Sequence, residues 1–239
     1  MNIFVYDDFL DKYKKTVRTI EESLNKLNLQ GKIIYLKNIK NPKEALQKEI
    51  NNGAKTIISV GNNKTANLII NILANFSEKV PLALIPVGNE NSIASSLGIP
   101  NEKEACFILS SRRIEKINLA EANDVLFINN FFIKGKDTSI KINDSYTISP
   151  QKNGDLFVYN LPPAKKIFEN IKIDPQDKIL NLYIQIGSKN KTHLLVKKAE
   201  ILNEKEKGLI DELIEVSLPV KIEPSEKTID LIVGKERLF

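Results

Sequence analysis

The sequence predicts a two-lobed protein in which a parallel α/β lobe precedes an all-β lobe. In the first half, short apolar runs alternate with segments whose apolar residues recur every three or four positions, which is typical of a parallel sheet with helices on both faces. In the second half, short β-rich runs are separated by Gly, Asn, Asp or Pro, as in an antiparallel sandwich. The length of 239 residues is ample for two such lobes.

The first lobe is expected to begin with a strand and a helix. Residues 2–6 (NIFVY) form an apolar run suited to a buried strand, and apolar residues at helical spacing follow as far as Leu27. A second strand is expected at residues 32–36. The helix after it should be capped by Asn41, with a proline at its first position, and should end near Gly53.

The same alternation continues to about residue 110. Apolar runs and helical spacing predict a strand, a helix, a strand and a short helix in turn, and a last helix begins where Asn101 and Glu104 have capping-box spacing. The two strands are expected at 56–60 and 82–86, and the helix between them at 65–76. Strand and helix thus alternate four times, which predicts a Rossmann-like parallel sheet.

The pattern changes after about Arg113 to short strands. We expect these at residues 124–128, 138–142, 155–159, 178–186, 193–197, 218–222 and 228–233, with one helix at 204–214. Residues 1–115 would then form the α/β lobe, completed by residues 226–239. Residues 116–225 would form the β-sandwich lobe.

Composition excludes several classes of protein. No apolar run reaches the ~18 residues that a membrane-spanning helix needs, and the first ten residues have no basic segment. A single cysteine, Cys106, and a single histidine, His193, exclude an internal disulfide and a zinc cluster with soft ligands. The 35 basic and 30 acidic residues are interleaved, which favours a solvated surface despite the net charge of +5. We therefore expect a cytoplasmic protein with no nucleic-acid partner.

The loop Ser59–Asn67 (SVGNNKTAN) lies where α/β proteins often bind phosphates, directly after an expected buried strand. It matches neither of the common phosphate motifs. A Walker A loop has a glycine directly before its lysine, where this chain has Asn63. The dinucleotide pattern GxGxxG fails because Asn63 and Ala66 stand in place of its second and third glycines.

This loop and the next one together resemble the diacylglycerol kinase catalytic-domain family. In that family one strand leads into GGDGT, and the next leads into P-x-G-T-x-N-D-x-A and then L-G-I-P. Gly61 and Thr65 match the outer positions of the first motif, and the second is matched at Pro86, Gly88, Asn91, Ala94 and 97–100. The likeness covers about residues 1–119 and is architectural beyond them. It implies the two-lobed fold of NAD kinases and diacylglycerol kinases.

The resemblance implies an ATP-dependent lipid kinase, a transferase of phospholipid metabolism that uses Mg²⁺ and acts at the membrane surface. Nucleotide would be bound by Gly61, Asn62, Asn63, Lys64, Thr65, Gly88, Asn89 and Asn91. The family takes further acidic residues from a D-G pair and a D-G-E motif. Their nearest counterparts are Asp174 and Asp177 as metal ligands and Glu212 as general base. The chain could also form a homodimer, which the resemblance does not decide.

Departures from the family leave alternatives open. The centre of GGDGT has become Asn-Asn-Lys, so two glycines and an acidic residue are lost. Lys64 either supplies a cation to an ATP phosphate or is an exposed turn lysine. Asp174 and Asp177 also fit ordinary turn chemistry, and Glu212 also fits an exposed helical position. The chain is then an active lipid kinase, a catalytically degenerate pseudokinase acting as a nucleotide- or ligand-binding module, or an NAD kinase.

Overall fold

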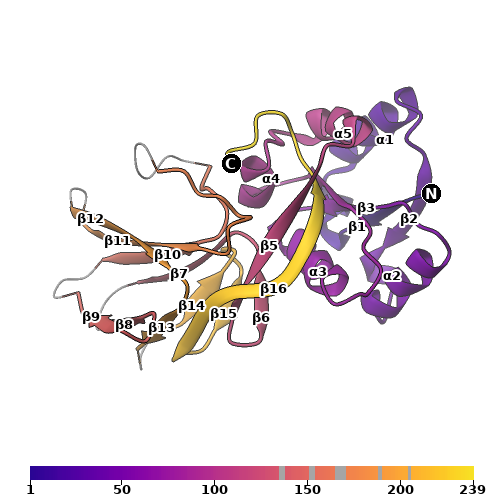
Figure 1. The fold of residues 1–239 in the computed structure, drawn as a ribbon. Helices are drawn as coiled ribbons and strands as arrows, with labels where there is room; N and C mark the ends of the chain where they lie inside the picture. The colour runs from indigo at the N-terminus through magenta and orange to yellow at the C-terminus, as the bar shows by residue number, and fades with distance from the viewer. Residues whose placement is uncertain (135–137, 151–153, 165–170, 188–189, 204–205) are drawn as a thin grey trace. The chain divides into compact units, whose positions relative to one another are not determined.

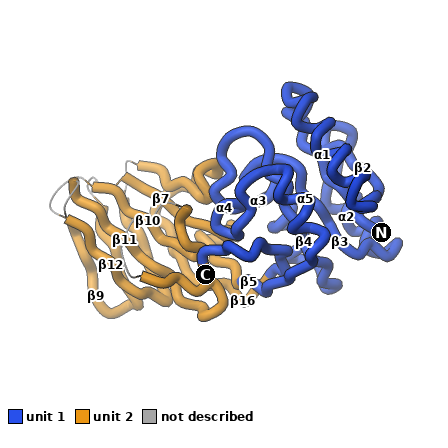
Figure 2. Tube along the Cα trace, turned by 90° about the horizontal axis from the view of Figure 1, so that it is seen from above, with its two compact units in different colours: residues 1–117, 229–238 blue, residues 118–228, 239 orange. Residues whose placement is uncertain are grey.

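The computed structural model describes residues 1–134, 138–150, 154–164, 171–187, 190–203 and 206–239. The chain divides into two compact units (Figure 2). Unit 1 comprises residues 1–117 and 229–238, and unit 2 comprises residues 118–228 and 239. Within the described ranges, every helix is too short or too polar to cross a membrane.

Unit 1 is built on a parallel sheet whose strands follow the spatial order β2-β1-β3-β4. The strands are β1 (Asn2–Tyr6), β2 (Gly31–Tyr35), β3 (Thr56–Gly61) and β4 (Leu82–Pro86). On the far side of β4, Leu231 of β16 (Val220–Ile232) pairs in parallel with Leu82. Every residue of β3 and β4 is buried, because helices cover both faces of the sheet.

Helices of unit 1 cover both faces of this sheet, as expected when right-handed crossovers join its parallel strands (Figure 1). On one face α1 (Lys14–Lys26) contacts α5 (Glu102–Ser111), and on the other lie α2 (Pro42–Asn51) and α3 (Asn63–Leu73). The short α4 (Ser92–Ser96) follows β4, and 3₁₀ helices occupy Asp8–Lys12 and Leu36–Asn38.

Two predicted helix caps are confirmed. The Asn41 side chain accepts a hydrogen bond from the Glu44 N–H at 3.3 Å, and the Asn101 side chain accepts one from the Glu104 N–H at 2.9 Å. Each bond satisfies one of the N–H groups that a helix leaves unpaired at its start.

Unit 2 is an antiparallel sandwich. One layer has the order β12-β11-β10-β7-β14-β15, and in the other β13, β8 and β9 follow β16, with β5 and β6 beside it. Side chains of both layers form one core, to which β7 contributes Phe131 and β8 contributes Ile140. The strands are β5 (Ile114–Ala122), β6 (Val125–Phe127), β7 (Asn130–Lys134), β8 (Ser139–Ile142), β9 (Tyr146–Ile148), β10 (Asp155–Tyr159), β11 (Leu180–Ile186), β12 (Asn190–Val196), β13 (Ala199–Leu202), β14 (Gly208–Ile210) and β15 (Ile214–Val216). The predicted fold class is confirmed.

The helix expected at residues 204–214 is wrong. Residues 204 and 205 lie outside the described part, and residues 208–214 belong to the hairpin of β14 and β15. Its turn is closed by a bond from the Leu213 N–H to the Ile210 carbonyl at 3.0 Å. The spacing of apolar residues in this short segment fits a helix and two short strands equally well. As strands, the two halves of the hairpin contribute Ile210 and Val216 to the core of the sandwich.

Candidate functional site

Three loops of unit 1 meet at the carboxyl ends of β1, β3 and β4. These strands are parallel neighbours, so their ends share one edge of the sheet. The Asp7 N–H donates to the Val60 carbonyl at 3.1 Å, and the Val87 N–H donates to the Gly61 carbonyl at 2.9 Å. The two loops expected to bind nucleotide are therefore adjacent.

The first of these loops is the turn from β3 into α3. Asn62 is the N-cap of α3, and its side chain accepts a hydrogen bond from the Lys64 N–H at 3.0 Å. The Lys64 side chain is exposed. A Cβ added at Gly61 would lie 2.3 Å from the Thr65 hydroxyl oxygen, so only glycine allows this close approach. The backbone of the loop therefore packs closely against the Thr65 side chain.

Asn63 joins the two loops. Its side chain is only 1% exposed; Nδ2 donates to the Ser92 hydroxyl at 2.9 Å, and Oδ1 accepts from the Ile93 N–H at 3.2 Å. The Asn63 main-chain N–H donates to the Glu90 carbonyl at 2.9 Å. The Glu90 carbonyl thus takes up the Asn63 N–H at the start of α3, and the Asn63 side chain takes up the Ile93 N–H at the start of α4. In a phosphate site such N–H groups would point at the ligand.

The second loop packs against an aromatic pair. Gly88 has φ 77°, and the Asn91 side chain donates to its carbonyl at 2.9 Å, whereas Asn89 is exposed. A Cβ at Gly88 would lie 3.2 Å from the Tyr13 hydroxyl oxygen. Tyr13 in turn stands edge-on to Phe9, with ring centroids 5.7 Å apart. The segment after β1 therefore covers this loop.

Asp7 is a site residue that sequence reasoning missed. One carboxylate oxygen accepts a hydrogen bond from the Thr65 hydroxyl, and the other accepts one from the Phe9 N–H at 3.1 Å. The signal was present, because Asp7 directly follows β1 and the end of β1 lies beside the end of β3.

Little space is left between the loops. The cavity there has a volume of about 10 Å³, and its walls come from residues 59–66, 84–86 and 91–94. That is room for about one water molecule. A phosphate group is larger than this cavity.

The carboxylates expected to bind metal lie together in one turn of unit 2. The Asp177 N–H approaches the Asp174 carbonyl at 3.4 Å. Each side chain accepts from a nearby main-chain N–H, Asp174 from Gln176 at 2.9 Å and Asp177 from Ile179 at 2.7 Å. Partial burial raises the pKa of Asp177, and the Asp174 carboxylate raises it further. No group of three or more metal-ligating side chains is found in the described residues.

Glu212 is exposed in the turn between β14 and β15. Burial raises the pKa of Tyr159, and the negative charge of nearby Glu212 raises it further. The preceding Asp211 is fully buried and holds the chain between β6 and β7. Its carboxylate accepts hydrogen bonds from three main-chain N–H groups, those of Ile128 at 3.2 Å, Asn129 at 2.9 Å and Asn130 at 2.8 Å.

Comparison with known proteins bears on the two loops. Residues 10–122 match the family model described as the diacylglycerol kinase catalytic domain. The resemblance to diacylglycerol kinases is confirmed. A Pseudomonas aeruginosa protein named "Probable lipid kinase YegS-like" is 32% identical over 77 residues, which are 32% of this chain. The matched part spans 26% of that relative.

Solved structures with a similar fold match nearly the whole chain. A diacylglycerol kinase from Bacillus anthracis has a TM-score of 0.73 at 18% identity, covering 98% of this chain and 97% of the other. An NAD kinase from Archaeoglobus fulgidus in complex with ATP has a TM-score of 0.60 at 18% identity, covering 100% and 96%. The chain therefore has the fold of diacylglycerol kinases and NAD kinases.

Proposed function

We propose that this chain is a catalytically degenerate relative of the diacylglycerol kinases, which keeps their fold as a binding module and does not transfer phosphoryl groups from ATP. The observation that carries the proposal is the bonding of Asn63. A phosphate loop presents free N–H groups to the anion. Here the N–H groups of Asn63 and Ile93 are bonded to protein oxygens, beside a cavity of about 10 Å³.

The Thr65 hydroxyl is also engaged, because it donates to Asp7. A nucleotide that used this hydroxyl and the Ile93 N–H would first have to break both bonds. Each hydrogen bond of this kind contributes roughly 0.5–1.5 kcal/mol to stability, and more where a charged group takes part. The loops therefore resist opening, which supports a role without nucleotide phosphates.

Two turns of unit 2 support the same proposal. Lys178 directly follows Asp177 and has φ 58°, and Glu212 directly follows Asp211 and has φ 71°. Glycine is favoured at such angles, and the D-G and D-G-E motifs of the family have glycine after the aspartate. Glu212 then stands at the glycine position of D-G-E, and Leu213 stands where the family has its glutamate.

A second candidate is an active ATP-dependent lipid kinase, and the pair Asp174 and Asp177 favours it. Adjacent carboxylates repel each other, and a bound Mg²⁺ would relieve that repulsion. Mg²⁺ needs only one or two protein carboxylates when phosphates supply further oxygens. In this case the two loops of unit 1 would have to open around the nucleotide, with Asn63 releasing the Ile93 N–H.

Phosphoryl transfer to diacylglycerol in mixed micelles distinguishes the two candidates. The full chain would be incubated with Mg²⁺ and ATP labelled at the γ-phosphate, beside the Asp177→Asn variant and the Asp155→Asn variant, which changes an exposed aspartate of β10. We expect no labelled lipid above background from any of the three. Label that rises with protein concentration and is lost only in Asp177→Asn would establish a kinase and refute the proposal.

A further inference from the structure

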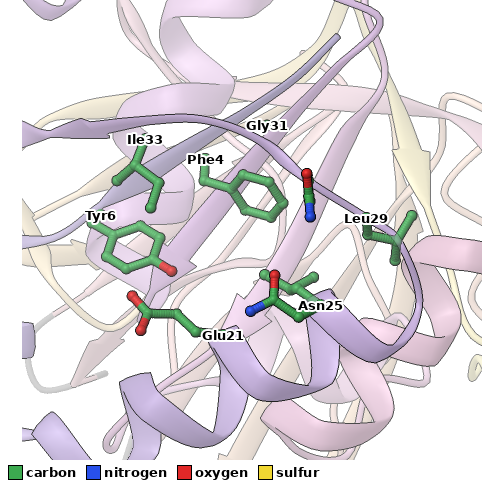
Figure 3. Close-up of a pocket in the computed structure, with 9 residues that line it drawn as sticks. Phe4, Tyr6, Glu21, Asn25, Leu29, Gly31 and Ile33 are labelled. Atoms are coloured by element: carbon green, nitrogen blue, oxygen red, sulfur yellow. The ribbon is translucent and has the colours of Figure 1, made fainter.

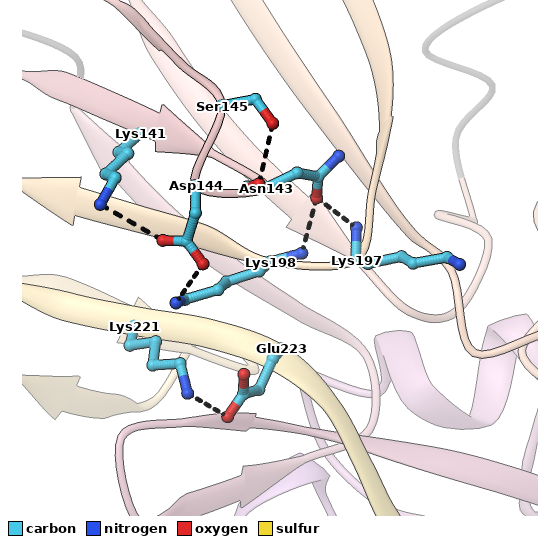
Figure 4. A network of polar contacts seen from close by, with 8 residues as sticks. All are labelled: Lys141, Asn143, Asp144, Ser145, Lys197, Lys198, Lys221 and Glu223. Atoms are coloured by element: carbon cyan, nitrogen blue, oxygen red, sulfur yellow. Dashed lines mark hydrogen bonds and ion pairs between the residues drawn. The ribbon is translucent and has the colours of Figure 1, made fainter.

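A pocket lies between α1 and β2, away from the loops described above (Figure 3). Its volume is about 330 Å³, within the range of small-molecule sites. It reaches Gly31, the first residue of β2, which pairs with Asn2 at the start of β1. The pocket therefore extends toward the amino ends of these strands, whereas the loops lie at the carboxyl ends.

The pocket exists because β2 is an edge strand. In the described sheet it pairs with β1 alone, and its inner face is left partly open. Ile33 is 39% exposed and Tyr35 is 40% exposed on that face, although both are large apolar residues. A ligand at this place would cover apolar surface that the protein leaves in water.

The walls combine buried aromatic and aliphatic side chains with polar ones. Phe4 and Tyr6 of β1 are each only 2% exposed, and Leu24 of α1 is 6% exposed. The Tyr6 ring is fixed further by an edge-on contact with Tyr35, with centroids 5.6 Å apart. The electron-rich faces of such rings attract cations within about 6 Å of the ring centre.

Glu21 gives the pocket a negative charge. It is the one acidic or basic residue in the lining, and Figure 3 shows its carboxylate beside the Tyr6 ring. Burial raises the pKa of Tyr6, and the Glu21 carboxylate raises it further, as expected for close neighbours. Arg18, the nearest base along the helix, is paired with Glu22 at 3.0 Å. Among the described residues Glu21 itself has no ion-pair partner.

We propose that this pocket binds a small organic ammonium ion, with its charge against Glu21 and the Tyr6 ring and its apolar part against Phe4 and Leu24. A carboxylate beside aromatic faces is a combination that recognises ammonium groups. An anionic ligand would be repelled by Glu21. The amide of Asn25, which faces the pocket from the same helix, offers a hydrogen bond to a hydroxyl group on the ligand. This inference does not depend on whether the chain is a kinase.

Calorimetric titration of the full chain tests the proposal with three probes: tetramethylammonium, choline and phenethylammonium. The neutral analogue of choline, with a tert-butyl group in place of trimethylammonium, controls for shape. We expect saturable binding of at least one cation, and for choline at least tenfold tighter binding than for its neutral analogue. Glu21→Gln should weaken cation binding roughly tenfold, about 1.4 kcal/mol. Glu78→Gln, at an exposed acidic residue of unit 1 that does not line the pocket, should leave it unchanged.

Sedimentation with phosphatidylcholine vesicles distinguishes a lipid headgroup from a free amine as the source of the ammonium group. Vesicle binding that Glu21→Gln removes assigns the site to the headgroup, and its absence beside calorimetric binding assigns it to free amines. The proposal is overturned if none of the three cations binds at up to roughly 10 mM. It is also overturned if Glu21→Gln binds as well as the unmodified chain, or if a dimer that Ile33→Ser dissociates is found to cover the pocket.

Discussion

Replacement of Asn63 by alanine is expected to destabilise unit 1 by about 1.5–4.5 kcal/mol. The change removes the bond to the Ser92 hydroxyl at 2.9 Å and the bond from the Ile93 N–H at 3.2 Å. The first loss alone costs roughly 0.5–1.5 kcal/mol, and an N–H left without an acceptor in a buried place costs roughly 1–3 kcal/mol. Asn63 is 1% exposed, so water cannot readily replace the lost amide.

Urea unfolding followed by far-UV circular dichroism in the helical band measures this effect. In the described part of the chain α1–α5 all belong to unit 1, so the helical signal reports on that unit. Asn89→Ala is the matched control, because Asn89 is an exposed asparagine of the neighbouring loop and its removal should cost less than about 0.5 kcal/mol. If the two alanine variants unfold at the same urea concentration, the idea that Asn63 holds the loops together is wrong.

Three further predictions concern other parts of the molecule. Thr65→Val should cost unit 1 roughly 1–3 kcal/mol in the same urea experiment, because it leaves the Asp7 carboxylate without its hydroxyl donor, and a cost equal to that of Asn89→Ala would refute this. Lys178 has φ 58°, an angle that glycine adopts more easily than lysine, so Lys178→Gly should leave the thermal stability of unit 2 unchanged or raise it by up to about 1 kcal/mol. Lys172→Gly is the control: it changes an exposed lysine without positive φ and should lower the stability. Burial lowers the pKa of His193 in the folded chain from its ordinary value of 6.5. As the pH falls, the unfolded chain therefore binds a proton at His193 before the folded chain does, and the free energy of unfolding decreases below pH 6.5. Above pH 6.5 the contribution of His193 to stability is constant. Proton NMR of this single imidazole should give a pKa below 6.5, His193→Gln should remove this part of the pH dependence, and a pKa at or above 6.5 would contradict it.

Much of the fold could be predicted because its signals are local. The capping asparagines Asn41 and Asn101 act on N–H groups three residues away, so sequence spacing reveals them. Strand and helix period likewise identified β1 to β4 and the helices between them. The hairpin at residues 208–216 was missed because three-residue strands are too short to show a period, and its turn has neither glycine nor proline.

The state of the candidate site could not be predicted, because it depends on side chains far apart in sequence. Asn63 bonds to Ser92 and Ile93, 29 and 30 residues further along the chain, and Thr65 bonds to Asp7, 58 residues before it. The motif comparison placed the two loops directly after two strands, where the structure has β3 and β4 end. It could not reveal that an asparagine in place of the family's aspartate would bond across to α4, since that follows only from the packing of β3 against β4.

Calorimetric titration of Mg-ATP into the full chain tests the central claim most directly, because it asks whether the closed loops of unit 1 admit nucleotide phosphates. The bonding of Asn63 and Thr65 predicts no saturable heat, and the same result for ADP. Saturable binding of Mg-ATP that is weakened by Thr65→Val but not by Asp155→Asn, at an exposed residue of β10, would contradict the claim and would show that the loops open around the nucleotide.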